Sequence, residues 1–161
     1  MIFLIGFMGS GKSTVAHQLS TDLGRPYIEM DECIEKQEGL SIAEMFSQYG
    51  ESYFREKETE FLKSINEDGI VSTGGGVILS EENREILSEN TVVYLKASWH
   101  TILERLEEDT KRPLWKGDLE EKESRFKERL SIYERTADYI VAVDKKTPKQ
   151  IAQEIEACLK G

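Results

Sequence analysis

Short apolar runs alternate along the chain with longer stretches in which apolar residues recur every three or four positions. The apolar runs lie at residues 2–5, 27–30, 69–73, 91–95 and 139–143. Continuous runs of this length are typical of strands that are buried on both faces. Between the runs, spacings such as that of Val15, Leu19 and Leu23 place apolar side chains on one face of a helix. Strands that alternate with helices in this way predict an α/β fold with a parallel sheet covered on both faces.

Glycines and capping residues indicate where several of these helices begin and end. Breaks at Gly39 and Gly50 divide the polar, periodic region 32–66, which we expect to be helical. Near the end of the chain, Thr147 is a good N-cap and Pro148 follows at the first helical position. The last helix therefore has a well-defined predicted start.

Two segments in the second half of the chain differ sharply in pattern. The side chains of Leu119, Phe126, Leu130 and Tyr133 predict the inner face of a helix that ends near residue 136. The preceding residues 109–118, DTKRPLWKGD, follow a helix expected at about 98–108, carry many charges and turn residues and have no apolar period. We expect them to form a mobile loop.

Composition narrows the class of protein without identifying it. A chain of 161 residues with 39% hydrophobic and 32% charged residues suits one globular domain spanning residues 1–161. The formal net charge of −10 argues against general nucleic-acid binding, and no apolar run is long enough to cross a membrane. Cys33 and Cys158 form no metal-ligand spacing, and we expect both to be reduced in a cytoplasmic protein.

The motif with the clearest chemistry is GFMGSGKS, at residues 6–13, which fits G-x-x-x-x-G-K-[ST]. It lies between a predicted strand and a predicted helix, which is the context that a phosphate-binding loop requires. Its glycines allow backbone N–H groups to point inward, and the helix adds the positive end of its dipole. Lys12 is expected to reach the β- and γ-phosphates, and the Ser13 hydroxyl to bind Mg²⁺. We expect ATP rather than GTP, since VDKKT at 143–147 supplies no guanine-reading motif.

A second group of residues is expected at the same edge of the sheet. Asp31 follows the second predicted strand, and the carboxyl ends of parallel strands meet where the phosphate loop lies. Its carboxylate would accept a proton from an acceptor hydroxyl or help to hold Mg²⁺, or it would simply cap a helix at 32–38. Three consecutive glycines, 74–76, suggest a ligand close to the backbone or a tight turn. Arg55 is placed to pair with an anionic acceptor, if it is not a solvated charge.

Six motifs, in this order and spacing, resemble those of shikimate kinases over essentially the whole chain. The motifs are GFMGSGKST (6–14), MDECI (30–34), YFREKE (53–58), STGGG (72–76), RPL (112–114) and ERLSIYERTAD (128–138). The resemblance implies the P-loop NTPase fold of nucleoside monophosphate kinases. That fold is a three-layer α/β/α sandwich with a five-stranded parallel sheet of order 2-3-1-4-5 and a mobile lid at about 109–118.

The resemblance also implies a reaction and the residues that serve it. The reaction transfers the γ-phosphate of ATP to the 3-hydroxyl of shikimate, with Mg²⁺, in the pathway to chorismate and the aromatic amino acids. The implied ATP-binding residues are Gly9, Ser10, Gly11, Lys12, Ser13, Thr14, Arg105, Arg112, Lys146 and Pro148. The implied shikimate-binding residues are Asp31, Arg55, Gly74, Gly75, Gly76 and Arg129. The catalytic residues would be Asp31 as proton acceptor, Lys12, and Arg112 as a lid arginine that closes on the phosphates.

One position departs from the family pattern. The family has Asp-x-Asp after the second strand, whereas this chain has Glu29-Met30-Asp31. We expect Glu29 to keep a water-mediated contact with Mg²⁺, because a bridging water absorbs the extra methylene. The loop before Pro148 is also short, which affects the assignment of Lys146.

We expect a monomer. The residues alone leave three alternatives to a shikimate kinase open. A related small-molecule kinase, such as a gluconate kinase, would share the phosphate loop but not the arrangement of Arg55, residues 74–76 and Arg129. An ATP-binding regulatory domain that has lost catalysis would tolerate damage at its catalytic positions, and none is damaged. A GTP-dependent switch lacks its guanine motif.

Overall fold

The computed structural model describes residues 1–107 and 119–161. The strands within these residues are β1 (Ile2–Ile5), β2 (Tyr27–Glu29), β3 (Ile70–Ser72), β4 (Thr91–Lys96) and β5 (Tyr139–Ala142). They form one sheet in the order β2-β3-β1-β4-β5, and every neighbouring pair is parallel. The predicted parallel sheet and its strand order are therefore confirmed.

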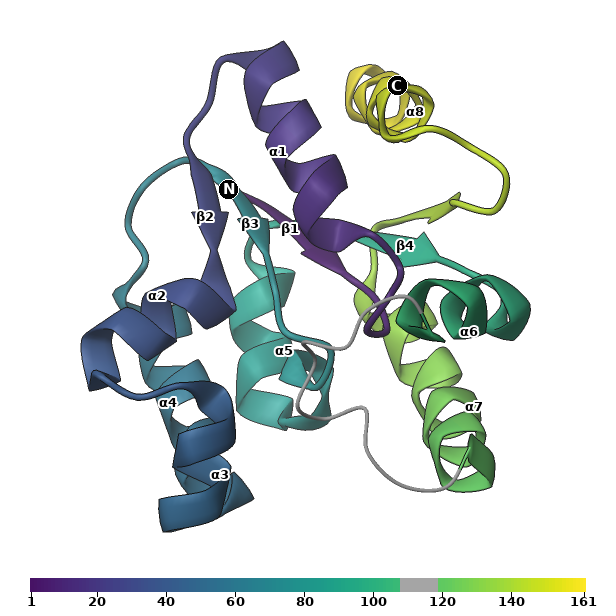
Figure 1. Ribbon diagram of the computed structural model, residues 1–161. Helices are drawn as coiled ribbons and strands as arrows, with labels where there is room; N and C mark the ends of the chain where they lie inside the picture. Colours follow the sequence, from purple (N-terminus) through teal and green to yellow (C-terminus); the bar gives the residue numbers. More distant parts are fainter. Residues whose placement is uncertain (108–118) are drawn as a thin grey trace.

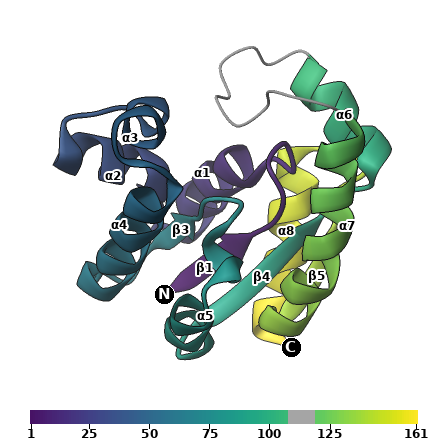
Figure 2. The same cartoon turned by 90° about the horizontal axis from the view of Figure 1, so that it is seen from below.

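Helices cover both faces of this sheet. They are α1 (Lys12–Leu23), α2 (Met30–Glu38), α3 (Ile42–Tyr49), α4 (Glu51–Ser64), α5 (Glu81–Ser88), α6 (Trp99–Glu107), α7 (Leu119–Thr136) and α8 (Pro148–Lys160), with a short 3₁₀ helix, η1 (Val77–Leu79). Helices α1 and α8 pack together on one face, and α5 and α7 pack on the other (Figure 1; Figure 2). Helices α2, α3 and α4 pack against one another beside the β2 edge.

Burial along the strands follows their place in the sheet. Strand β1 is the central strand of the sheet, and β3 lies between β1 and β2. Every residue of these two strands is buried. The edge strands β2 and β5 keep partly or fully exposed positions, because each has a neighbour on one side only. The continuous apolar runs in the sequence thus mark strands that lie between two layers of helix.

The predicted boundaries hold to within a residue or two, and one predicted residue is in the wrong element. Met30, expected to end the second strand, is instead the first residue of α2. The side chain of Met30 is fully buried. Its apolar character extended the predicted strand by one residue, although it packs into the core from the helix. The cap of α2 is Glu29, and the alternative role of Asp31 as an N-cap is therefore wrong.

The inner face of α7 is also different from the one predicted. Phe126 and Tyr133 are buried as expected, but Leu119 is 52% exposed. Figure 1 shows the first turn of α7 at the end of the helix that lies away from the sheet. The inner face is completed by two charged residues, Lys122 and Arg129, which are both buried.

The connectivity brings three loops to one edge of the sheet. Strand β1 lies between β3 and β4, so the chain leaves β1 at the point where the strand order changes direction. In sheets of this kind, ligands bind at that point, outside the carboxyl ends of the strands. The loop after β1, the start of α2 and the loop after β3 all lie there (Figure 1). No helix in the described ranges, 1–107 and 119–161, is both long and apolar enough to cross a membrane.

Candidate active site

The phosphate loop joins β1 to α1 and has the backbone that its glycines predict. Gly9 and Gly11 have φ angles of 82° and 91°, in the left-handed region that favours glycine. Helix α1 begins at Lys12, and no described side chain caps its N-terminus. The amide groups of its first turn are thus available to an anion, and the dipole of the helix favours one there.

Lys12 lies inside this loop rather than in solvent. Its Nζ atom donates to the carbonyl oxygens of Gly6, at 2.7 Å, and Phe7, at 3.1 Å. The side chain is buried. These contacts hold a cation over the concave side of the loop, where the phosphates of a nucleotide lie in proteins with this motif.

Arg105 reaches the same loop from α6. Its Nη1 atom donates to the Gly9 carbonyl at 3.1 Å, and a Cβ atom on Gly11 would lie 2.9 Å from that nitrogen. The β5–α8 loop lies close by, since Asp144 accepts a hydrogen bond from the Ser98 amide at the start of α6. This loop and α6 therefore lie side by side near the phosphate loop.

The two predicted residues of the β5–α8 loop occupy different roles in the structure. Pro148 is the first residue of α8, and Thr147 caps that helix as expected. The Nζ atom of Lys146 contacts both carboxylate oxygens of Glu154, at 2.9 and 2.8 Å. Its contact with ATP stays a prediction, and binding would have to compete with this ion pair. Arg112 and the predicted lid at 109–118 lie outside the described residues.

The three glycines after β3 each face a charged side chain of the site. A Cβ atom on Gly74 would lie 3.0 Å from both Asp31 Oδ1 and Glu58 Oε2. On Gly75 it would lie 3.9 Å from Arg129 Nη1, and on Gly76 it would lie 2.5 Å from Arg55 Nη1. The side chains of the site lie closely against Gly74 and Gly76, where a Cβ atom would crowd them, whereas the distance at Gly75 is an ordinary van der Waals contact.

Two carboxylates in this part of the site have oxygens without partners. Asp31 Oδ1 and Glu58 Oε2 are buried and accept no hydrogen bond from any described residue. Burial, together with the nearby Glu29 carboxylate, raises the pKa of Asp31 to about 6, although Lys12 opposes the change. Burial also raises the pKa of Glu58 to about 7, against the effect of Arg55. Buried acceptors of this kind are stabilised by hydroxyl donors of a ligand.

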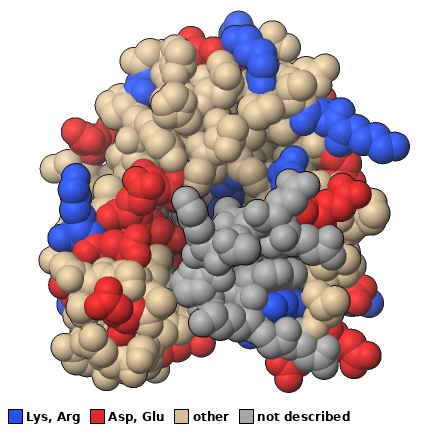
Figure 3. Space-filling model, in the orientation of Figure 1, with Lys and Arg blue, Asp and Glu red and all other residues tan. Residues whose placement is uncertain are grey.

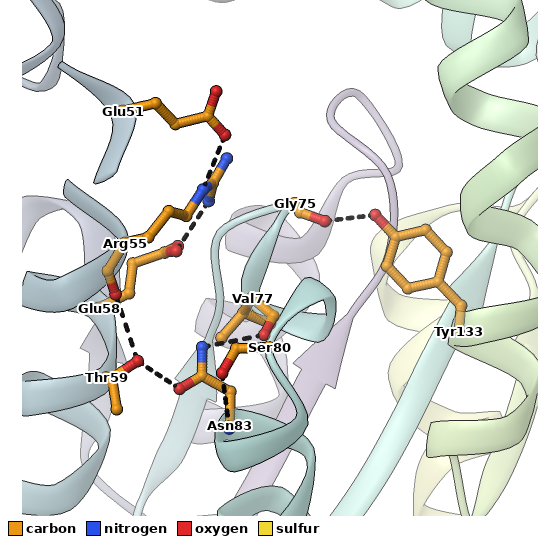
Figure 4. Close-up of polar contacts among 9 residues, drawn as sticks. All are labelled: Glu51, Arg55, Glu58, Thr59, Gly75, Val77, Ser80, Asn83 and Tyr133. Atoms are coloured by element: carbon orange, nitrogen blue, oxygen red, sulfur yellow. Dashed lines mark hydrogen bonds and ion pairs between the residues drawn. The ribbon is translucent and has the colours of Figure 1, made fainter. Parts of the chain in front are cut away.

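Two arginines face these carboxylates and differ in how they are held. Arg55 donates through Nη1 to Glu58 at 2.7 Å and through Nε to Glu51 at 3.1 Å (Figure 4). Arg129 is only 8% exposed and lies over the Phe7 ring, 5.9 Å from its centroid. Among the described residues no carboxylate pairs with Arg129, and burial lowers its pKa. A buried guanidinium without an anionic partner indicates a site for an anionic ligand.

One cavity brings these groups together, although they come from different parts of the chain. The predicted residues that line it are Gly9, Gly11, Lys12, Ser13, Thr14, Glu29, Asp31, Arg55, Gly74, Gly75, Gly76 and Arg129. Ser10 is buried within the loop itself. The local cations matter because acidic side chains gather on the surface over α2 (Figure 3) and the net charge is −10. An anionic ligand would have to be attracted by Lys12, Arg55 and Arg129 against the field of the whole protein.

Ser13 and Glu29 provide the oxygen atoms that suit Mg²⁺. Both line the cavity, and Glu29 Oε2 accepts a hydrogen bond of 2.6 Å from the Tyr27 hydroxyl. Ser13 Oγ lies 3.4 Å from Ser72 Oγ. The described residues contain no group of three or more metal-binding side chains. This set fits an ion that is held by one or two protein oxygens, with water and phosphate as its other ligands.

Glu58 is the main residue of the site that reasoning from the sequence missed. It lies on α4 one turn after Arg55, within a run of charged residues typical of a solvated helical face. Its side chain is 0% exposed. The spacing of three residues between Arg55 and Glu58 was the available signal, because it places an ion pair on one face of a helix.

The close approach of Arg55 to the loop leads to a prediction for Gly76→Ala. The added methyl group would displace the guanidinium, so we expect KM for the anionic acceptor to rise about 10-fold or more, the effect of weakening one charged contact. KM for ATP should stay within about 2-fold, since the phosphate loop is not touched. Steady-state kinetics with each substrate varied in turn would measure both values.

Gly69→Ala is the matched control for that variant. A Cβ atom there would lie 2.8 Å from the Pro26 carbonyl oxygen, so it also creates a clash, but outside the cavity. We expect a lower Tm and an unchanged KM for the acceptor. An equal rise of KM in the two variants would contradict the close fit of Arg55 against Gly76.

Comparison with known proteins gives one consistent result. The sequence model of the family described as shikimate kinase matches residues 8–160. A shikimate kinase of Sulfurihydrogenibium sp. is 44% identical over 162 residues, covering 99% of this chain and 97% of the relative. A shikimate kinase of Aquifex aeolicus is 42% identical over 163 residues, covering 99% and 96%.

Solved structures agree in both fold and length. A shikimate kinase from Acinetobacter baumannii in complex with shikimate superposes with a TM-score of 0.93 and 34% identity, covering 99% of this chain and 92% of that one. The crystal structure of the enzyme from Aquifex aeolicus gives a TM-score of 0.87 at 42% identity, covering 99% and 96%. One cavity holds the phosphate loop, the two arginines Arg55 and Arg129 and the carboxylates of Asp31 and Glu58, and with these matches it leads to one conclusion. The chain belongs to the shikimate kinase family.

Proposed function

We propose that this protein transfers the γ-phosphoryl group of ATP to the 3-hydroxyl of shikimate and releases ADP and shikimate 3-phosphate. The observation that carries the proposal is the composition of one cavity. At one end Lys12 lies in a phosphate loop. At the other end lie Arg129, which pairs with no carboxylate of the described residues, and two carboxylates with oxygens that accept no hydrogen bond from those residues. Such a cavity accepts a nucleotide together with an acceptor that has both a carboxylate and hydroxyl groups.

The acceptor end matches the chemistry of shikimate group by group. Its carboxylate suits the guanidinium groups of Arg129 and Arg55, and charged hydrogen bonds of this kind fix orientation as well as affinity. Its ring hydroxyls suit the buried oxygens Asp31 Oδ1 and Glu58 Oε2. The relative from Acinetobacter baumannii was solved in complex with shikimate, which supports this assignment.

The proposed transfer needs a proton acceptor and positive charge on the phosphates. The 3-hydroxyl oxygen forms a bond with the γ-phosphorus, the bond from that phosphorus to the bridging oxygen of ADP breaks, and the hydroxyl proton passes to Asp31. With a pKa of about 6, Asp31 is ionised at neutral pH and remains basic enough to accept a proton. Lys12 stabilises the charge that develops on the transferred group.

The proposal also assigns residues to Mg²⁺, to the adenine and to the ATP phosphates. Ser13, directly, and Glu29, through water, would hold Mg²⁺, which when bound neutralises charge on the β- and γ-phosphates. Arg105 and Pro148 would flank the adenine, and Arg112 would close over the phosphates from the segment 109–118. We also propose that the protein acts as a cytoplasmic monomer.

The test is a coupled assay of ADP release with MgATP and, in separate reactions, shikimate, quinate, gluconate or no acceptor. We expect ADP with shikimate and only background without an acceptor, and ³¹P NMR should place the phosphate at the 3-hydroxyl. Release with gluconate and not shikimate would identify a related kinase instead. ATP binding without turnover on any acceptor would identify a regulatory module.

An Arg129→Met variant, assayed beside the unaltered protein, links the activity to this cavity. Loss of one buried charged contact should raise KM for shikimate about 30-fold or more. Arg84→Met is a suitable control, since Arg84 Nη1 donates to the Ile78 carbonyl outside the cavity. Equal shikimate kinetics in all three proteins would show that the acceptor binds elsewhere.

A further inference from the structure

The carbonyl oxygens of the glycine loop are all engaged by the protein. The Gly75 carbonyl accepts a hydrogen bond from the Tyr133 hydroxyl on α7 (Figure 4). The carbonyls on either side, within residues 74–76, accept from the amides of Val77 and Leu79, at 3.2 and 3.1 Å. The amides of residues 74–76 donate to no acceptor in the described part of the chain. The loop therefore presents donors, not acceptors, to the ligand.

Tyr133 is held rigidly enough to determine the position of its hydroxyl. The residue is fully buried, and its ring stacks on that of Tyr94 with 5.0 Å between the centroids. Burial raises the pKa of the phenol, so the hydroxyl keeps its proton and acts as a donor to Gly75. A packed ring has little freedom to turn, and the hydrogen bond therefore has a well-defined direction.

The hydrogen bond on Gly75 also determines the direction of the next amide. The carbonyl of Gly75 and the N–H of Gly76 belong to one planar peptide unit, so holding the oxygen orients the N–H. Glycine backbones otherwise sample many conformations, and ordering three of them on binding would weaken affinity. A loop that is already ordered in the free protein avoids this loss.

Two further contacts connect the loop to the arginines of the site. Arg129 lies one helical turn before Tyr133 on α7, so one helix carries both the guanidinium and the hydroxyl. On the far side, Asn83 Nδ2 donates to the Val77 carbonyl at 3.1 Å and Asn83 Oδ1 accepts from Thr59 on α4, at 2.7 Å (Figure 4). Helix α4 also carries Arg55. The loop is thus held between the two helices that provide the arginines.

We propose that Tyr133 is a positioning residue for the acceptor, whose hydroxyl orients the peptide between Gly75 and Gly76 toward the acceptor's carboxylate. This inference rests on the proposed function. In this proposal the Tyr133 hydroxyl does not touch the substrate. It orients the Gly75–Gly76 peptide, whose N–H does. Because Asn83 and the turn at 74–77 hold the rest of the loop, loss of the hydroxyl should disturb this peptide and the neighbouring Arg129 guanidinium, with which the hydroxyl also interacts, and not the fold.

The test compares Tyr133→Phe with Tyr94→Phe. Both variants keep the two stacked rings, and neither removes a residue that lines the cavity. Isothermal titration with shikimate should show Kd raised about 3- to 15-fold in Tyr133→Phe, the effect of one hydrogen bond. Kd for ATP should be unchanged, and Tm should fall by no more than about 4 °C in either variant. Tyr94→Phe should bind shikimate like the unaltered protein.

Three results would overturn the inference. In the first, Tyr133→Phe binds shikimate as tightly as the unaltered protein. In the second, shikimate and ATP affinities fall by the same factor, which indicates a general loss of structure. In the third, Tyr94→Phe shows the same selective loss, so that packing of the ring pair is responsible. If the unaltered protein itself fails to phosphorylate shikimate, the proposed function is wrong and the inference falls with it.

Discussion

Replacing Asp31 by asparagine should lower kcat about 10³-fold, within the range for loss of a general base. Asparagine keeps the shape of the side chain and a hydrogen-bonding oxygen, so the acceptor hydroxyl can still be bound but cannot pass its proton to this residue. KM for shikimate should change much less than kcat. The measurement is steady-state kinetics at pH 8, where Asp31, with its pKa of about 6, is ionised in the unaltered protein.

The same substitution should make the protein more stable at high pH. The pKa of Asp31 is raised from 3.8 to about 6, so the folded state binds this proton more tightly than the unfolded state does. Ionisation therefore costs stability as the pH rises through 6, by about 3 kcal/mol at most. Asp31→Asn avoids this cost, and its free energy of unfolding should exceed that of the unaltered protein at pH 8. The difference should vanish below about pH 4.

Two measurements check these statements together. Urea unfolding at pH 8 and pH 4 gives the stability difference, and the pH profile of kcat/KM should fall on the acid side with a midpoint near pH 6. Glu32→Gln is the matched control, because Glu32 is an exposed neighbour on α2 that does not line the cavity. A stability gain in that control, or the same gain at both pH values, would contradict the assignment of the effect to ionisation of Asp31.

Lys12→Met should lower kcat by about 10³-fold, the effect of removing a donor that is aimed at developing charge. Methionine fills a similar volume, but it leaves the carbonyls of Gly6 and Phe7 without the Nζ donor and the phosphates without a cation. Affinity for shikimate in the absence of nucleotide should change by no more than about 3-fold, since Lys12 belongs to the other end of the cavity. Rapid-quench measurement of a single turnover isolates the chemical step.

The loss of Lys12 should also act on Asp31. The charge of Lys12 lowers the pKa of Asp31, so its removal should move the acid limb of the pH profile to higher pH. Lys63→Met, which removes an exposed lysine paired with Glu82, should change neither kcat nor the profile. If Lys12→Met keeps kcat within about 10-fold of the unaltered protein, Lys12 does not stabilise the transferred group.

Most of the fold could be predicted from local patterns. Strands that lie between two helical layers must be apolar on both faces, so β1 and β3 appear in the sequence as short continuous apolar runs. Helix caps are local hydrogen bonds, so Thr147 and Pro148 were sufficient to predict the start of α8. The phosphate loop could be predicted for the same reason. All its groups come from one short segment, and Gly9 and Gly11 have positive φ angles, which favour glycine.

The acceptor end of the site depended on contacts between distant segments. Arg55, Asp31 and Arg129 come from three helices. Position in the sequence made Asp31 and Arg55 candidates, whereas the role of Arg129 was inferred from the family resemblance. Glu58 and Leu119 show the limit of such patterns. Glu58 is a charged residue with no exposed surface, and Leu119 is an apolar residue that is half exposed.

Local sequence patterns were enough to predict the succession of strands and helices and the phosphate loop, and the motifs together indicated the family. Which charges are buried could be seen only in the folded chain, because burial depends on what packs against a side chain and not on its neighbours along the chain. The raised pKa values of Asp31 and Glu58 and the hydrogen bond from Tyr133 to Gly75 arise from that packing. Water is excluded from these groups only when α2, α4 and α7 meet around the glycine loop.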